Sequence, residues 1–596
     1  MLRKILNHPN RKKNDIYPNG AQYMAILQQK GKGIIESRFF KKVRDIFVPL
    51  SIFVVGLWFS VLKAMGTGLS YIPGDLGDNR FNNYVLEHFY RWITRLDPTY
   101  WSASFFYPFP NTIAFSDNLL GSAIFYAGFR RIGLDRETAF QAWYILGFLL
   151  NFIAAYYVLK KLGFTSLAGG AGAFFFSFGL PLWGQQGHAQ LIYRCAIPLA
   201  CYFLWDFSET PRVWKLILLS LSIIWQIYLS IYNGIFLLML VAVMVILLPF
   251  FVSSRSLVDW LSYWPRRLIG AWQQESLIQH LYFLIMILVE GLGSIAILYP
   301  YYSTSRIYGF ARNWSSVETM LPRLRSFFLA DNSLIWGKWS RLMTGMGPFR
   351  WEHQLFPGLT VAVLVLIGLI WRPKSESRRI AWLAFWTVVI LVGITFDFQG
   401  HSIYRLLITV PGLNSLRSVT RIVLVLMWPG AIFIAYALDA LLRLRVGWLH
   451  KNLQYGFAYL LIGMLLFESL AVKYTSFSKA DAQNRLNIIM NTILTSVPQD
   501  PILVLSSDGK QYPESEIDAM LVAQELGWPV FNGYSGNFPP GYNDNILNMC
   551  RVIPDRIISY MKFANISNES FYLGIMKRVV PVGFDDCDQE WWIKMP

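Results

Sequence analysis

The chain has 596 residues, of which 54% are hydrophobic and only 15% are charged, and its formal net charge is +17. A soluble protein carries about a quarter charged residues because its surface needs them, so this composition excludes a set of ordinary soluble domains. Four cysteines in so long a chain exclude a scaffold built on disulfides and show no metal-ligand spacing. The apolar residues gather into stretches of about 20, the length that crosses a bilayer as a helix. The sequence therefore predicts a polytopic membrane protein, whose basic residues contact anionic headgroups and not nucleic acid.

The predicted spans and their flanking charges give a topology. Residues 1–46 are polar and basic and predict a cytoplasmic tail. Residues 47–473 predict a mainly α transmembrane helix bundle of about eleven spans. The spans are expected at 47–65, 139–159, 167–182, 191–204, 216–231, 234–251, 281–298, 355–371, 380–396, 423–442 and 457–471. Residues 119–132 are short for a span and carry Arg130 and Arg131, so they predict a helix in the interface.

This arrangement places the lysine-containing turns, including Lys160, Lys215, Lys374 and Lys451, on the same side as the tail. The outside then receives a long first loop at 66–137, short turns at 183–190 and 228–233, a large loop at 301–354 and a loop at 399–421.

Residues 474–596 also lie outside on this topology and are no longer membrane-like. Residues 501–506 predict a short buried strand and residues 515–524 a helix, so we expect a small extracytoplasmic α/β domain. Cys550 and Cys587 lie in this part of the chain, where a disulfide between them would survive.

Two acids of the first outer loop are candidates for catalysis. Asp75 and Asp78 lie in a Gly-Asp-Leu-Gly-Asp turn that precedes a helical pattern at 81–92, which we expect along the interface. A carboxylate held close to lipid is costly unless it is paired or used, and one here would be placed to take a proton from a sugar hydroxyl. The alternative is that these acids cap the following helix, with Asp78 as its N-cap. The spacing favours capping for Asp78 more than for Asp75.

Arginine is the basic residue of the predicted outer loops, apart from Lys338. A planar guanidinium engages phosphate oxygens two at a time, so an arginine-rich outer surface suits a phosphate or pyrophosphate carried by a lipid. The candidate phosphate-binding residues are Arg306, Arg405, Arg417 and Arg421. The alternative for such residues is contact with lipid headgroups at the ends of spans.

Other polar residues lie near the predicted outer ends of spans and would support the site. They are His188, Gln190, Glu352 and His353. His188 is a residue type that neutralises charge or orients a carboxylate, although interfacial histidines more often only form hydrogen bonds. Glu290 lies inside an apolar span, so we expect it to face the bundle as a structural or gating residue.

Several short motifs, taken in this order, resemble the membrane glycosyltransferases of the GT-C superfold. They are the Gly74-Asp-Leu-Gly-Asp78 turn after the first span, residues 106–111 with 116–121, residues 353–358 before a span, and residues 410–417 with Arg421. Residues 532–540 resemble a motif of uncharacterised bacterial proteins of this kind.

The resemblance implies an integral glycosyltransferase of the bacterial inner (plasma) membrane. It would move a sugar, with inversion, from a polyprenyl-phosphate-linked donor to an extracytoplasmic glycan or lipid acceptor. The first-loop acid that acts as base maps best onto Asp75 and second onto Asp78, and loop arginines would hold the donor phosphate. Where members use a divalent ion, the same two acids would ligate Mg or Mn.

Three other interpretations compete with this one, and one of them is a catalytically silent scaffold that keeps the fold. A transporter or flippase of lipid-linked sugars would need ionisable residues along a membrane path and an internal repeat of spans. Only Glu290 and Glu468 lie well inside predicted spans, and no repeat is visible. A glycan polymerase or ligase would use similar loop chemistry, and the sequence does not separate it from single-sugar transfer.

Overall fold

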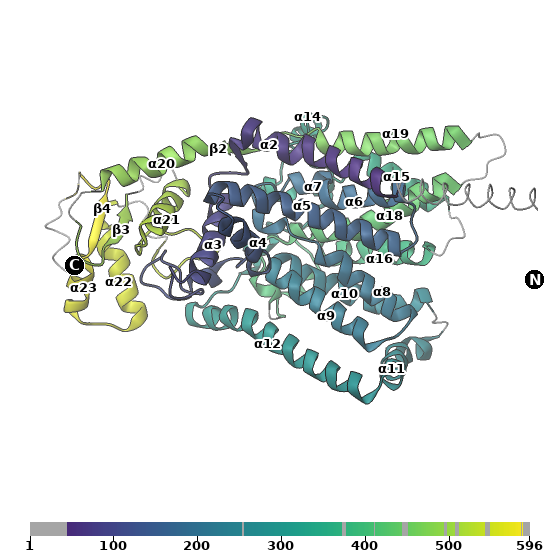
Figure 1. Ribbon diagram of the computed structural model, residues 1–596, viewed down its shortest axis with the longest axis horizontal. Helices are drawn as coiled ribbons and strands as arrows, with labels where there is room; N and C mark the ends of the chain where they lie inside the picture. The colour runs from purple at the N-terminus through teal and green to yellow at the C-terminus, as the bar shows by residue number, and fades with distance from the viewer. Residues whose placement is uncertain are drawn as a thin grey trace, which may run out of the picture.

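The computed structural model describes residues 45–252, 256–371, 377–410, 412–443, 451–493, 497–506, 512–542, 549–585 and 587. Residues 1–44 of the predicted cytoplasmic tail lie outside the described residues, as do Arg372, Lys374 and Arg445 of the predicted inner turns. The described chain is mainly helical, with a bundle of apolar helices at one end and the C-terminal segment at the other (Figure 1).

Eight described helices are long and apolar enough to cross a membrane. They are Asp45–Met65, α5 (Arg136–Lys161), Ser166–Trp183 (α6, Ser166–Phe178, with α7, Leu180–Trp183), α10 (Ile231–Val252), α12 (Leu277–Tyr308), α16 (Arg378–Thr395), Val419–Arg443 (with α18, Val423–Arg443) and Asn452–Leu470 (in α19, Lys451–Leu470). Shorter helices form at α8 (Ala196–Glu209), α9 (Val213–Leu229) and α15 (Leu359–Ile370). Each predicted span therefore falls on a helix, while the count of about eleven spans remains a prediction.

Helix α18 lies in the centre of the bundle and is buried along nearly its whole length. It packs against α6, α10, α15 and α16. The approach to α6 is close, because a Cβ on Gly172 would lie 2.7 Å from the carbonyl oxygen of Ala431. Small residues let helix backbones approach in this way, and in a bilayer such packing is a main source of helix association.

Helix α12 has the opposite character and lies at the edge of the bundle (Figure 1). Most of its surface is exposed, and it packs chiefly against α9. It continues to Tyr308, so the first residues of the predicted 301–354 loop are helical. The buried Glu290 faces the bundle as expected, since its carboxylate accepts a 2.6 Å hydrogen bond from Ser220 of α9.

One segment of the bundle is not helical, and three side-chain amides satisfy its backbone. The predicted span at 191–204 begins as a regular helix only at Ala196, after the short η5 turn (Ala189–Leu191) and an irregular stretch. Asn151 of α5 donates to the Ile192 carbonyl at 2.7 Å, Gln226 of α9 to the Tyr193 carbonyl at 2.9 Å, and Asn233 of α10 to the Leu191 carbonyl at 3.2 Å. Irregular backbone at such a depth requires internal partners, because lipid supplies none.

The long first loop forms helices where the pattern predicts them: α3 (Asp78–Ile93) and α4 (Leu120–Arg131). Helix α3 is covered by protein along most of its length, since it packs against α4 and α21 (Glu514–Leu526). A short strand that precedes it, β1 (Tyr71–Pro73), pairs antiparallel with β2 (Ser476–Ser478). The first loop and the C-terminal segment are thus built against each other.

The C-terminal segment contains the predicted strand and helix. Strand β3 (Ile502–Leu505) pairs parallel with β4 (Val579–Val582), and α21 contains the predicted helix 515–524. Helices α20 (Lys479–Thr492), α22 (Val552–Ala564) and α23 (Glu569–Met576) complete it. The predicted disulfide between Cys550 and Cys587 is present. That residues 474–596 form a separate domain remains a prediction.

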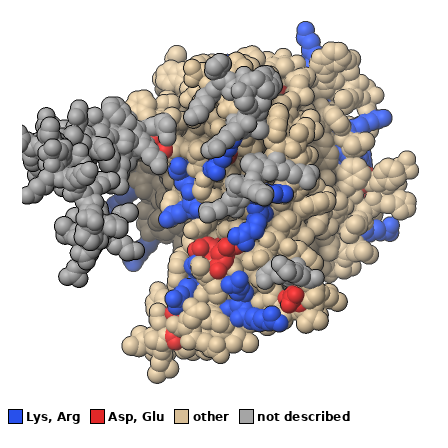
Figure 2. Space-filling view, turned by 90° about the vertical axis from the view of Figure 1, so that its right-hand side faces the viewer, with Lys and Arg blue, Asp and Glu red and all other residues tan. Residues whose placement is uncertain are grey.

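The end of the bundle remote from the C-terminal segment is basic. Figure 2 views this end and shows lysine and arginine side chains spread across it. Arg379 reaches Glu209 at 3.3 Å and Arg443 reaches Asp439 at 3.3 Å, so part of this charge is paired. A basic end face is what the positive-inside rule predicts for the cytoplasmic side.

Replacement of Asn151 by leucine tests the amide support of the irregular segment. The variant leaves the Ile192 carbonyl without its donor and the Arg194 amide without its acceptor, which lies at 2.8 Å. We expect the free energy of unfolding to fall by roughly 3 kcal/mol, because two buried polar groups lose their partners. Thermal or denaturant unfolding in detergent measures this. Asn484→Leu on the exposed face of α20 is the matched control, and equal losses in both variants would contradict the assignment.

Candidate active site

A cavity of about 400 Å³ lies where the bundle meets the C-terminal segment. Its walls come from the start of α3, the loop before α4, the turn between α7 and α8, the start of α10, the C-terminal part of α12 and the loop that follows it. The segment before α18 and residues 534–538 of the C-terminal segment close it. Charged side chains of both signs line it: Asp78, Asp117, Glu352, Arg312, Arg417 and Arg421.

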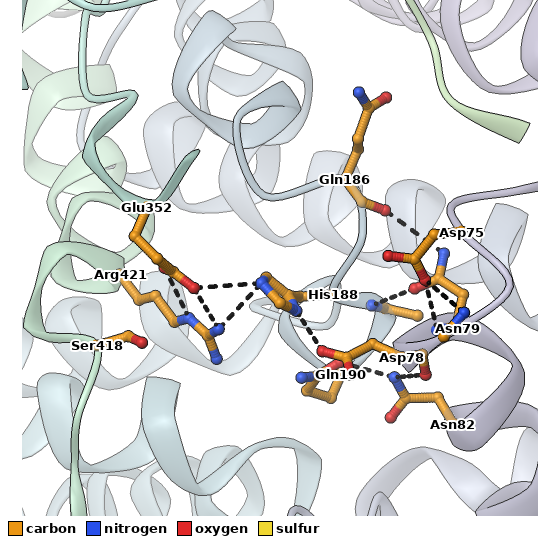
Figure 3. A network of polar contacts seen from close by, with 12 residues as sticks. Asp75, Asp78, Asn79, Asn82, Gln186, His188, Gln190, Glu352, Ser418 and Arg421 are labelled. Carbon is orange, nitrogen blue, oxygen red and sulfur yellow. Dashed lines mark hydrogen bonds and ion pairs between the residues drawn. The ribbon is translucent and has the colours of Figure 1, made fainter. Parts of the chain in front are cut away.

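A continuous chain of ionisable groups crosses one wall of this cavity (Figure 3). The His188 Nδ1 lies 2.6 Å from Asp78 Oδ2, and its Nε2 lies 3.3 Å from Glu352 Oε1. The Arg421 guanidinium holds both oxygens of Glu352, with its Nη2 at 2.7 Å and its Nε at 3.2 Å. Four segments of the chain that are distant in sequence are joined by these contacts.

The two carboxylates of this group stabilise its two cations, although the cations His188 and Arg421 lie 3.0 Å apart and oppose each other. Burial and the Arg421 charge oppose protonation of His188, but the hydrogen bonds to the Asp78 and Glu352 carboxylates outweigh them and raise its pKa to about 9. Burial likewise opposes ionisation of Glu352, yet Arg421 and His188 hold its pKa well below the usual value. At neutral pH the group therefore contains two carboxylates and two cations, a balance that buried ions require.

The structure reverses the capping that the sequence favoured. The N-cap position of α3 is Gly77, and Asp78 is the first helical residue. Its carboxylate binds His188 and also accepts a hydrogen bond from the Tyr534 hydroxyl, so the expectation that Asp78 caps the helix is wrong. Asp75 accepts the backbone amides of Gly77 at 3.2 Å and Asn79 at 3.4 Å instead.

The two first-loop acids consequently differ in environment. Asp78 lines the cavity, and Asp75 does not. Burial raises the pKa of Asp78, but the hydrogen bond and charge of His188 outweigh it and the net shift is downward. The pKa of Asp75 is raised, first by desolvation and then by the Asp78 charge.

A shared metal site at Asp75 and Asp78 does not fit this arrangement. The Asp75 oxygen Oδ1 accepts backbone amides, and both Asp78 oxygens are taken by His188 and Tyr534. Within the described residues, no group of three or more His, Cys, Asp or Glu side chains is arranged to hold a metal ion.

The four predicted phosphate-binding arginines divide into two pairs. Arg306 and Arg405 are exposed, stack over the rings of Tyr302 and Trp314, and lie outside the cavity lining. Arg417 and Arg421 line the cavity. The guanidinium of Arg421 is occupied by Glu352, as described above.

Arg312 is a third arginine of the cavity, and no feature of the sequence distinguishes it from the other arginines of the predicted outer loops. It is half-buried and donates from Nη2 to the Gly536 carbonyl at 2.6 Å. Burial lowers its pKa, and the charge of Arg417 lowers it further. Neither Arg312 nor Arg417 forms an ion pair with any carboxylate of the described chain. These two cations are therefore available to an anion.

The remaining supporting residues also divide. Gln190 lines the cavity and accepts a 2.7 Å hydrogen bond from Asn82 of α3. His353 is fully buried and does not line it, because its Nδ1 and Nε2 contact Ser326 and the Thr319 carbonyl, each at 2.9 Å. Burial lowers the pKa of His353. We therefore assign His353 a structural role, in which it joins two parts of the loop before α15, whereas Gln190 forms part of the cavity wall.

Two further cavity residues lie in motifs of the sequence that resemble the GT-C enzymes, but the sequence did not single them out as site residues. Asp117, in residues 116–121, accepts the Ile231 amide at 2.7 Å, and burial raises its pKa to about 6. Tyr534, in residues 532–540, donates to Asp78. No local pattern distinguishes either residue from a turn or packing residue, since both are selected by contacts across the fold.

The raised pKa of His188 gives a stability prediction with a defined sign. A group whose folded pKa is raised contributes stability fully below its unfolded pKa and loses it as the pH rises through about 9. We expect the free energy of unfolding of the wild-type protein to fall by roughly 3 kcal/mol between pH 6.5 and 9.5 because His188 loses its proton. His188→Gln removes this component, whereas His401→Gln, at an exposed loop histidine, should retain it. Unfolding in detergent at several pH values measures the difference, and identical pH profiles for wild type and His188→Gln would refute it.

No family model and no curated protein sequence matches the chain. Among solved structures it is similar to the archaeal oligosaccharyltransferase AglB from Archaeoglobus fulgidus in complex with an inhibitory peptide and a dolichol-phosphate. The TM-score is 0.50 at 14% identity, over 88% of this chain and 69% of that chain. The apo form of the Archaeoglobus fulgidus oligosaccharyltransferase gives a TM-score of 0.47 at 12% identity, over 90% and 71% of the two chains.

The mycobacterial arabinofuranosyltransferase AftD gives a TM-score of 0.39 at 13% identity, over 76% of this chain and 30% of that chain. The oligosaccharyltransferase and AftD are both membrane glycosyltransferases of the GT-C superfold. The similarity to AglB confirms the resemblance seen in the sequence: this membrane protein has a GT-C-like fold.

Proposed function

We propose that the chain is an integral membrane glycosyltransferase that moves a sugar from a polyprenyl-phosphate-linked donor to an extracytoplasmic acceptor, with inversion. The observation that carries the proposal is the cavity at the outer end of the bundle, where carboxylates and arginines line one space. Glycosyl transfer from a lipid phosphate needs both: a base for the acceptor hydroxyl and cations for the leaving phosphate.

The donor phosphate is assigned to Arg312 and Arg417. Both are half-buried, both line the cavity, and no described carboxylate neutralises either. Helix α12 brings Tyr301 to the same cavity, while the rest of that helix is largely exposed. A polyprenyl tail lying in lipid beside α12 would therefore reach the cavity with its phosphate. That the archaeal neighbour was solved with a dolichol-phosphate supports a lipid-linked donor.

The acceptor base is assigned to Asp78 in preference to Asp75, because Asp78 lines the cavity. Its lowered pKa keeps it ionised at neutral pH, as a proton acceptor must be. The acceptor oxygen forms a bond to the anomeric carbon from the face opposite the phosphate, and its proton passes to the Asp78 carboxylate. The bond from that carbon to the phosphate oxygen breaks, and the polyprenyl phosphate leaves with the electron pair beside Arg312 and Arg417.

The basic end face supports the orientation of the enzyme. Arginines and lysines are scattered over the end of the bundle remote from the C-terminal segment (Figure 2), so we infer that this end faces the cytoplasm and that the cavity and the C-terminal segment lie outside it. In a bacterium the protein would then lie in the inner membrane, with the acceptor a glycan or lipid of the cell envelope.

The proposal is tested with purified protein in proteoliposomes and a panel of radiolabelled polyprenyl-phosphate sugars. We expect transfer to an envelope-derived acceptor fraction by the wild type, and a loss of about a hundredfold or more in Asp78→Asn, because general-base catalysis supplies 10²–10⁴ in rate. Asp75→Asn should retain most of the activity. A reversed order of the two variants would move the base to Asp75, and sugar movement across vesicles without transfer would favour a transporter.

Lysine replacements of the arginines test the donor site. Arg312→Lys and Arg417→Lys keep the charge and lose the planar fork, so we expect the KM for the donor to rise about tenfold with little change in kcat. Arg306→Lys and Arg405→Lys are matched controls, since both residues are exposed outside the cavity. Equal effects in all four variants would indicate nonspecific attraction to the lipid phosphate and would remove the assignment.

A further inference from the structure

The C-terminal segment sends one loop into the cavity, and this loop reaches the proposed base. Residues 534–538 line the cavity, and the Tyr534 hydroxyl donates a hydrogen bond to Asp78 Oδ1. The other carboxylate oxygen, Oδ2, contacts His188. Both oxygens of Asp78 therefore have partners before any acceptor arrives, and Figure 3 shows the His188 side of this carboxylate.

The two ends of this loop, Asn532–Gly533 and Tyr542, are held by a buried carboxylate. Glu516 of α21 is almost fully buried and accepts hydrogen bonds from Asn532 Nδ2 and the Gly533 amide, each at 3.0 Å. It also accepts one from the Tyr542 hydroxyl at 2.6 Å, so both ends of the loop are tied to one residue. This support fixes the loop where its tip enters the cavity.

The tip of the loop is attached to two outer loops of the bundle. Arg312 donates to the Gly536 carbonyl at 2.6 Å, and Asn537 donates to the Phe115 carbonyl at 3.0 Å. Gly533 lies so close to the ring of Phe106 that an added Cβ would come within 2.2 Å of it. The tip therefore extends from Arg312, in the proposed phosphate site of the sugar donor, to Asp78, the proposed catalytic base.

The Tyr534 hydroxyl has the chemistry of an acceptor hydroxyl. It is an O–H donor directed at the oxygen that would receive the acceptor proton. Its own ring is fixed edge-on against Phe81, with centroids 5.7 Å apart. Burial first, and then the Asp78 charge, raise the pKa of Tyr534, so it remains a donor and keeps its proton.

We propose that Tyr534 is a specificity-determining residue. Its hydroxyl occupies the place on the Asp78 carboxylate that the acceptor hydroxyl would take, and an acceptor binds there only by displacing the Tyr534 hydroxyl. This inference rests on the proposed function for the identity of Asp78 as base. An acceptor must replace the lost hydrogen bond with one of its own, so water and poorly fitting alcohols are disfavoured. The residue thereby limits hydrolysis of the donor as well as the choice of acceptor.

Access to Asp78 is tested without any sugar substrate. The full-length protein is treated with a water-soluble carbodiimide and glycine ethyl ester, and modification of Asp78 is followed by peptide mass spectrometry. We expect labelling about tenfold faster in Tyr534→Phe, since the ring is retained and a hydrogen bond to a charged group is removed. Tyr512→Phe is the matched control, because Tyr512 lines the same cavity and its ring lies 6.2 Å from that of Tyr534. Labelling that is unchanged in Tyr534→Phe, or equally raised in both variants, overturns the inference.

Donor hydrolysis separates this inference from the proposed function. With radiolabelled polyprenyl-phosphate sugar and water as the only acceptor, we expect Tyr534→Phe to release free sugar about tenfold faster than wild type. Faster labelling with unchanged hydrolysis would overturn the displacement of Tyr534 by acceptor, while leaving the enzyme proposal in place. If neither wild type nor the variants turned over any donor while Tyr534→Phe still showed faster labelling of Asp78, the enzyme proposal would be contradicted. The conclusion that Tyr534 limits access to Asp78 would remain.

Discussion

The site depends on four charges that are buried together and balance one another. Asp78, His188, Glu352 and Arg421 come from α3, an irregular turn, a loop before α15 and the segment before α18. An ion removed from water is costly unless an opposite charge and hydrogen bonds replace the solvent, so no member of this group is stable in its position without the others. The interaction therefore fixes the relative positions of the loops as well as the chemistry of the cavity.

The irregular turn that carries His188 depends in its own way on the bundle. A continuous helix through residues 184–195 would place these side chains at helical spacing and would satisfy its own backbone. The chain instead leaves three carbonyl groups for Asn151, Gln226 and Asn233, one from each of three helices. Because the bundle supplies these partners, the backbone is free to bring His188 and Gln190 to the cavity.

The cavity is chemically asymmetric, and the asymmetry supports the proposed transfer. Arg312 and Arg417 lie free of carboxylate partners in the described chain, whereas Arg421 is neutralised by Glu352. Two arginines are therefore able to attract an anion, and the third, Arg421, holds Glu352 in place beside His188. The C-terminal segment joins both sides, since its loop contacts Arg312 at Gly536 and Asp78 at Tyr534.

The sequence by itself determined the membrane-embedded helical architecture. Apolar stretches of about 20 residues and the distribution of lysine are local properties, and each predicted span falls on a helix. The strand at Ile502–Leu505, helix α21 and the Cys550–Cys587 bridge were equally predictable from short patterns and from the few cysteines.

Tertiary structure decided which polar residues form the site. The sequence ranked Asp75 before Asp78 as the base, whereas in the structure Asp78 lines the cavity and Asp75 does not. It also presented Arg306, Arg405, Arg417 and Arg421 as equivalent cations. Only packing separates them, because charge, burial and partners depend on contacts between segments more than a hundred residues apart, such as Asp78 with His188 and with Tyr534. Arg312 and Asp117 were invisible for the same reason: an isolated arginine or aspartate in a loop has no local signature of the cavity it will line.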